Sequence, residues 1–236
     1  MDTRRMVSVV ATSVFGLLGA TNANALESGF YAGALVGQTE VDIDTDALDA
    51  AAQDPGSGIR STVDDSDTGF GVFVGWQFGR WFALEAQYAD LGKAGYRADQ
   101  TITNFFPTAP RDLTTSVGIA TDSSAISLSG VATIPLGEQF AVGVRLGAAR
   151  SEVKYTTDGI GMRGTEVLVS LGESDTRDNV AAVYGVSLEW DPITRFGMRL
   201  EWQEFKDVGK ENGGEGEDDT DGFDVTLLSL SAIGRF

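Results

Sequence analysis

The chain has 236 residues and a formal net charge of −18, with 35 Asp and Glu residues against 17 Lys and Arg residues. Phosphate backbones would repel so acidic a chain, so nucleic acid is excluded as a partner. The sequence contains neither cysteine nor histidine, which excludes stabilisation by disulfides and any catalysis that depends on an imidazole.

The N-terminus has the organisation of a secretory signal peptide. Arg4 and Arg5 precede a mostly apolar run, Val7 to Ala20, and Ala23-Asn24-Ala25 fits a small-x-small cleavage site. The apolar run is too short to span a bilayer as a helix. We expect residues 1–25 to be a signal peptide and residues 26–236 to form the mature domain.

The mature chain is dominated by segments in which every second residue is apolar, a period that indicates β-strands. In chain order these segments are Phe30–Gly37, Gly69–Phe78, Phe82–Leu91, Ser124–Ile134, Phe140–Arg150, Asn179–Trp190, Phe196–Phe205 and Phe223–Phe236. Glycines fill much of the second face of the first segment, which indicates a crowded interior. Each segment has about the ~9–11 residues that a tilted strand needs to cross a membrane.

Short and long connections alternate between these segments. Tight turns are expected at Gly79–Trp81, Pro135–Gln139 and Asp191–Thr194, and long polar connections at Val41–Asp67, Gly92–Ser123, Ser151–Asp178 and Lys206–Gly222. A short helix is expected at Ala47–Gln53, and weak alternation in Glu166–Leu171 suggests that the flanking strands extend as a hairpin. The pattern predicts an all-β fold: an eight-stranded antiparallel up-and-down transmembrane β-barrel with short periplasmic turns and long extracellular loops.

Charge fixes the direction in which each face points. Aromatic side chains cluster near the short turns, as expected of an interfacial girdle: Phe78, Trp81, Phe82, Phe140, Trp190 and Phe196. The mid-strand charges all lie on the mixed faces, and a Lys or Arg facing the lipid midplane would cost ~2–4 kcal/mol. We therefore expect an inward ion-pair network in the narrow barrel, formed by Glu85, Arg145, Glu189, Arg199 and Glu201.

The last segment ends in an aromatic residue, Phe236, and carries Leu228 and Leu230 on its apolar face. It resembles the C-terminal signal that the barrel-assembly machinery reads in bacterial outer-membrane barrels, although Gly234 stands where those strands usually carry a large residue. The segment Phe30–Gly37 resembles the opening strand of the OmpA-like and opacity-type barrels. The resemblance implies an interior ion-pair network, and Val131 stands where such barrels can carry a lysine.

The remaining motifs indicate neither a catalytic site nor a metal site. Glu217–Gly222 has the acid spacing of the first half of a calcium loop, but the closing ligand would fall on Leu228, so we expect a solvated acidic loop and no metal or cofactor. The run Asp42, Asp44 and Asp46 is interpreted in the same way. Phe105 and Phe106 are candidates for surface contact or for packing within a loop.

Two functions from different classes follow. The first is a structural and surface-interaction barrel of the bacterial outer membrane, acting in adhesion, membrane integrity or defence. The alternative is a narrow porin-like channel for small solutes. A periplasmic lipocalin-like binder would leave the mid-strand charges unexplained. The barrel enzymes of this membrane resemble one another in relying on histidine, so we expect no enzyme. Expected partners are outer-membrane lipid and lipopolysaccharide, the barrel-assembly machinery and an extracellular ligand of the loops; we expect a monomer.

Overall fold

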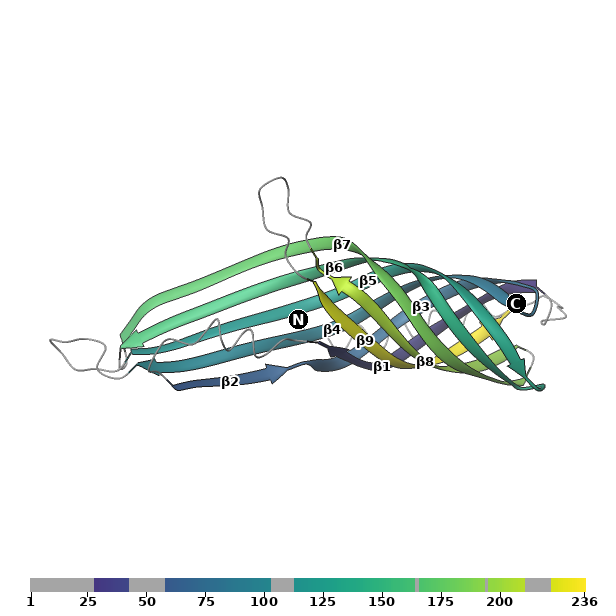
Figure 1. Ribbon diagram of the computed structural model, residues 1–236, viewed down its shortest axis with the longest axis horizontal. Helices are drawn as coiled ribbons and strands as arrows, with labels where there is room; N and C mark the ends of the chain where they lie inside the picture. The colour runs from purple at the N-terminus through teal and green to yellow at the C-terminus, as the bar shows by residue number, and fades with distance from the viewer. Residues whose placement is uncertain (1–27, 43–57, 103–112, 164–165, 194, 211–221) are drawn as a thin grey trace.

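The computed structural model describes residues 28–42, 58–102, 113–163, 166–193, 195–210 and 222–236 (Figure 1). These residues form antiparallel strands. In chain order they are β1 (Ser28–Val41), β2 (Gly58–Asp64), β3 (Ser66–Phe78), β4 (Phe82–Ile102), β5 (Leu113–Leu136), β6 (Phe140–Arg163), β7 (Glu166–Ile193), β8 (Phe196–Val208) and β9 (Phe223–Arg235). In the described part of the chain, no helix has the length and apolar character needed to cross a membrane.

The strands close into a barrel of eight, as the sequence predicts. The ring closes because β1 pairs with β9 on one side and with β3 on the other, while β4 pairs with both β3 and β5. β2 adds no further position to the ring. It pairs with the upper part of β4, through Gly58↔Thr101 to Asp64↔Gly95, and continues the line of β3. A closed ring leaves no unpaired backbone inside a bilayer.

The strands are longer than the sequence pattern predicted, although the hairpin extension expected at Glu166–Leu171 is confirmed by the pairing of β6 with β7 up to Arg163↔Glu166. β4 has 21 residues, β5 and β6 have 24 each and β7 has 28, so much of the expected connections Gly92–Ser123 and Ser151–Asp178 is strand. β2 likewise falls within the expected connection Val41–Asp67, and β8 continues to Val208. Above the membrane the outer face no longer contacts lipid, so the ladder continues without the apolar period that marks a membrane crossing. The expected helix Ala47–Gln53 lies outside the described residues.

The barrel wall is apolar on the outside and polar or charged on the inside. Outward side chains such as Trp76, Leu84 and Leu200 are about half exposed, whereas Glu85 and Arg145 are fully buried. The aromatics of the expected girdle, Phe78, Trp81, Phe82, Phe140, Trp190 and Phe196, all lie on the exposed surface near the short turns. This is the orientation that a lipid environment requires.

Beyond the barrel, β2, β4, β5, β6 and β7 continue as an open sheet, while β1, β8 and β9 stop short (Figure 1). We call this part the extracellular sheet, because it lies opposite the end with the short turns. Its outer face carries exposed ion pairs, Lys93–Asp122 at 3.3 Å and Arg97–Asp158 at 3.7 Å. The outer face therefore changes from apolar to charged where the sheet leaves the barrel.

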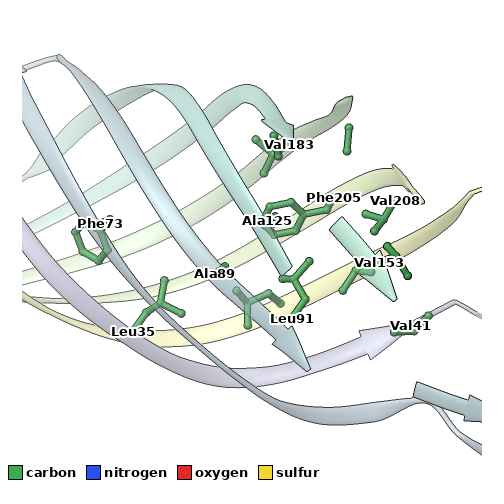
Figure 2. Packing of buried hydrophobic residues seen from close by; sticks show 14 of the residues in the cluster. Leu35, Val41, Phe73, Ala89, Leu91, Ala125, Val153, Val183, Phe205 and Val208 are labelled. Carbon is green, nitrogen blue, oxygen red and sulfur yellow. The ribbon is translucent and has the colours of Figure 1, made fainter. Parts of the chain in front are cut away.

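An apolar layer fills the upper interior of the barrel, on the side of the extracellular sheet. Leu91, Val153 and Phe205 meet there with Leu227 and Val183, each at most 1% exposed. Figure 2 shows these strands converging on Phe205, Val153 and Leu91. The sequence analysis did not anticipate this layer, because these residues lie on faces that are glycine-rich or charged nearer the turns.

Candidate functional site in the barrel interior

A charged cluster occupies the lower interior, between the short turns and the apolar layer. Arg145 on β6 contacts Glu85 on β4 through Nη2 and Glu201 on β8 through Nε, the latter at 2.7 Å. All three side chains are at most 3% exposed. Strands far apart in the sequence reach the same height because the staggered ladders of β4, β6 and β8 bring their inward positions together.

Arg199 on β8 joins the cluster from a second direction. Its Nη1 lies 2.9 Å from Glu85 Oε2 and 3.6 Å from Glu201 Oε2, and its Nε donates to Glu189 Oε1 at 2.8 Å. Glu85 therefore receives both buried guanidinium groups, which makes it the centre of the cluster. The structure brings together all the interior residues that the sequence analysis singled out.

Two further charges extend the cluster toward the short turns. Arg235 on β9 donates to Asp191 Oδ1 at 2.5 Å and to Glu189 Oε2 at 3.2 Å. The sequence analysis missed both, because each lies at a strand end where an alternating pattern does not decide orientation. The alternation of β9 could have indicated Arg235, because it shares the inward face of that strand with Ser231 and Ile233.

Aromatic rings close the cluster on the side of β1 and β3. The Tyr31 hydroxyl donates to Glu85 Oε2 at 2.8 Å, and the Arg199 guanidinium lies 5.1 Å from the centre of the Phe73 ring. Gly33 and Gly75 make room for these rings, since a Cβ at either position would collide with Phe73 or Tyr31. The crowded glycine face expected from the sequence is thus filled by aromatic rings of the neighbouring strand.

Neutral polar groups separate the charges from the apolar layer. Gln87 and Gln203 exchange hydrogen bonds across the barrel at 3.1 and 3.3 Å. Within the described residues, several buried polar atoms have no hydrogen-bond partner, namely Arg145 Nη1 and the hydroxyls of Ser127, Ser129, Ser229 and Ser231. A small polar pocket opens on the turn side and includes Gln77, Thr133, Glu189 and Arg235 in its lining. Buried groups of this kind are usually satisfied by water.

The carboxylates and guanidinium groups of the cluster neutralise one another. Every central carboxylate faces a guanidinium within hydrogen-bond reach, which leaves none poised as a general base. Among the residues that the structure describes, no group of carboxylates could hold a metal ion. A cluster of this kind, fully buried and paired, orders the barrel interior.

The sequence also matches a known protein family. A model described as the OmpA-like transmembrane domain matches residues 25–228. This chain belongs to that family. The protein is therefore an OmpA-like outer-membrane barrel, in agreement with the resemblance inferred from its terminal strands. A comparison with curated proteins found no match.

Solved structures similar to this OmpA-like barrel include small outer-membrane proteins. Ail, the attachment invasion locus protein of Yersinia pestis, is 14% identical with a TM-score of 0.42, over 88% of this chain and 99% of Ail. Neisserial surface protein A is 12% identical with a TM-score of 0.43, over 89% and 99%. OprG from Pseudomonas aeruginosa is 13% identical with a TM-score of 0.42, over 88% and 96%.

The other predicted residues lie on the outside of the OmpA-like barrel or beyond the described part. Leu228 and Leu230 are exposed on its apolar wall, and the Phe236 ring lies 5.7 Å from that of Phe30 on the neighbouring strand. Phe105 and Phe106 fall outside the described residues, as do Asp44, Asp46 and the acidic run 217–221. The contact and acidic-loop interpretations of those residues stay predictions.

Proposed function

We propose that this OmpA-like barrel is a structural and surface-interaction protein: it stabilises the outer membrane and displays its extracellular sheet and loops for adhesion, membrane integrity or defence. The observation that carries this proposal is the occupied interior. Paired charges fill the lower half and the layer around Phe205 fills the upper half. A side-chain-filled cylinder leaves function to the surface.

The same proposal includes the biogenesis of the chain. Residues 1–25 act as a signal peptide, residues 26–236 form the barrel domain, and the strand ending at Phe236 is read by the barrel-assembly machinery. The barrel acts as a monomer without enzymatic activity. Its contacts with the membrane are lipid along the apolar wall and lipopolysaccharide where the wall meets the charged face.

Planar-bilayer recording of the refolded protein tests the proposal. We expect no steady single-channel steps, because the apolar layer excludes ions from the upper interior. A conducting barrel inserted in the same bilayer serves as the positive control, and slower migration after boiling on a denaturing gel verifies folding. Steady steps would replace the proposal with the alternative, a narrow porin-like channel, for which the polar pocket and the unpartnered serine hydroxyls are the supporting observations.

A further inference from the structure

Four serine hydroxyls in the lower barrel interior have no hydrogen-bond partner among the described residues. Each serine is at most 3% exposed and lies directly opposite a polar side chain of the neighbouring strand: Ser129 opposite Glu85, Ser127 opposite Gln87, Ser229 opposite Glu201 and Ser231 opposite Arg199. One nitrogen of Arg145, Nη1, is also buried without a partner. Unsatisfied buried groups are costly, so these groups point to a small polar ligand among them.

The polar side chains opposite the serines are already engaged with one another. Both carboxylate oxygens of Glu85 accept from guanidinium nitrogens, and so do both oxygens of Glu201. The amides of Gln87 and Gln203 bond to each other. Water is the ligand that fits such sites, because it is small and both donates and accepts hydrogen bonds.

The polar pocket at the turn end leads to the same groups. It has a cavity volume of about 20 Å³, room for a single water, and its lining includes Val131 and Arg199. Val131 is the next inward residue below Ser129 on β5, and Arg199 lies opposite Ser231. The pocket therefore gives water a route into the charged cluster from the turn end.

The inward residues of the same strands become apolar just above these polar groups. The change occurs at Ala125 above Ser127 on β5, at Leu227 above Ser229 on β9 and at Phe205 above Gln203 on β8. All three apolar residues are at most 2% exposed and belong to the apolar layer. A site lined by apolar side chains offers water no hydrogen-bond partner and stays dry.

We propose that the lower interior binds water that enters from the turn end, and that the apolar layer around Phe205 seals this water from the extracellular side. The inference rests on the filled interior of the proposed function, and it names the ligand of the interior polar groups and the residues that stop it. Dissolved ions do not follow the water, because the pocket has room for one water only and the central charges are paired.

The absence of native cysteine permits a direct test. A single introduced thiol gives an isolated S–H infrared band, and water that reaches the thiol in D2O converts S–H to S–D. The matched variants are Ser129→Cys and Ala125→Cys, at inward positions of β5 that are 1% and 2% exposed. In the full mature chain refolded into lipid nanodiscs, we expect exchange to be at least about tenfold faster in Ser129→Cys than in Ala125→Cys.

Two further substitutions, each combined with the thiol variants, locate the entrance and the seal. Ala83→Leu fills the pocket that Ala83 lines and should slow exchange in Ser129→Cys at least about fivefold. Phe205→Ala opens the apolar layer and should bring exchange in Ala125→Cys to within about threefold of that in Ser129→Cys. Val183→Ala, a smaller truncation opposite Phe205, changes the rate in the same direction and serves where Phe205→Ala fails to refold. Heat-modifiable migration verifies folding.

Equal protection of Ser129→Cys and Ala125→Cys would overturn the inference, because the serines would then be dry. Equally fast exchange at both positions would show that the apolar layer is no seal, and an unchanged rate in Ala83→Leu would rule out entry at the turn end. Conductance decides the proposed function separately. A silent barrel with a protected Ser129→Cys rejects this inference alone, whereas a conducting barrel with fast exchange at both positions rejects the proposed function as well.

Discussion

The barrel and the extracellular sheet are built from the same strands, but the polarity of the faces changes from one region to the other. On β6, Val142, Val144 and Leu146 point outward within the barrel, and Arg150 and Lys154 continue the same face above it. The inner face changes in the other direction, from buried charge to the apolar layer. What lies outside the wall decides which residues are placed there: acyl chains select apolar side chains, and water selects charged ones.

For the outer face to change from apolar to charged, the charged residues of each strand must point outward above the boundary, as the apolar ones do below it. β6 does so without interruption, whereas β4 carries a bulge between Asp90 and Gly92 at the boundary. The bulge keeps the charged face of β4 outward, since Lys93 pairs with Asp122 as Tyr88 pairs with Ile126 below it. A bulge that re-aims side chains at a barrel rim is a recurrent device.

The largest effect is expected inside the barrel, from Glu85→Ala. Removal of the carboxylate takes a partner from both Arg145 and Arg199, whose side chains are at most 3% exposed, and we expect a loss of ~3–5 kcal/mol of unfolding free energy. Urea unfolding in lipid vesicles, followed by tryptophan fluorescence, measures it. The matched control is Glu152→Ala on the exposed outer face, with an expected change below ~0.5 kcal/mol. Equal changes in the two variants would contradict a central role for Glu85.

A cation moved to the other side of the wall tests the outer face. Val144 lies about midway along the apolar outer face of β6, so Val144→Arg should cost ~2–4 kcal/mol through exposure to the bilayer centre. Thr156→Arg places the same side chain on the same face of the same strand, within the extracellular sheet, and should be nearly neutral. Unfolding in vesicles of thicker and thinner bilayers locates the boundary between them. A neutral Val144→Arg would mean that this face is not in lipid.

The sequence was sufficient to predict the eight-stranded ring and which face of each strand points into lipid. It was insufficient to predict how far the strands extend beyond the membrane. Residues such as Leu84 and Leu200 alternate with charged neighbours, and only one phase of that alternation is compatible with lipid. The extracellular sheet carries small and polar residues such as Thr114, Gly118 and Thr156 on its outer face, where lipid no longer selects apolar side chains, so these segments were interpreted as connections. Backbone pairing makes them strands: both sides of one hairpin, from Gly92↔Ser123 to Ile102↔Leu113, fall within a single expected connection.

For the charged cluster in the barrel interior, the sequence identified the residues but not their pairing. Glu85, Arg145, Glu189, Arg199 and Glu201 were identifiable, because a mid-strand charge in a membrane barrel has one acceptable direction. Which carboxylate meets which guanidinium depends on the stagger of strands that are distant in sequence. That stagger gave Glu85 two arginines and added Arg235 and Asp191 at the turn end, and neither result could be inferred from spacing along one strand.

Crowding gives a smaller contrast between the two regions. A Cβ at Gly75 would collide with the Tyr31 ring in the barrel interior, whereas one at Gly172 in the extracellular sheet would meet no atom within 4 Å. We expect Gly75→Ala to destabilise the barrel by ~1–3 kcal/mol. Gly172→Ala should be neutral or slightly stabilising, because it reduces the freedom of the unfolded chain. Thermal unfolding in detergent, measured by heat-modifiable migration, compares the two. A tolerated Gly75→Ala would mean that the aromatic rings repack easily.

The smallest effect comes from an arginine five positions along the same strand from Arg145. Arg150 pairs with Asp178 at 2.5 Å, but its side chain is 75% exposed, whereas that of Arg145 is 1% exposed. Water and salt screen the outer pair, so Arg150→Ala should cost less than ~1 kcal/mol, and the difference should vanish in about 1 M salt, where the Debye length is ~3 Å. Arg145→Ala should remain strongly destabilising at either ionic strength, because Glu85 and Glu201 are at most 3% exposed and salt screens buried charges much less. Unfolding of both variants at low and high salt measures the contrast. Equal salt dependence would show that dissolved ions enter the barrel interior, and the distinction between a filled core and an exposed surface would then fail at this height of the wall.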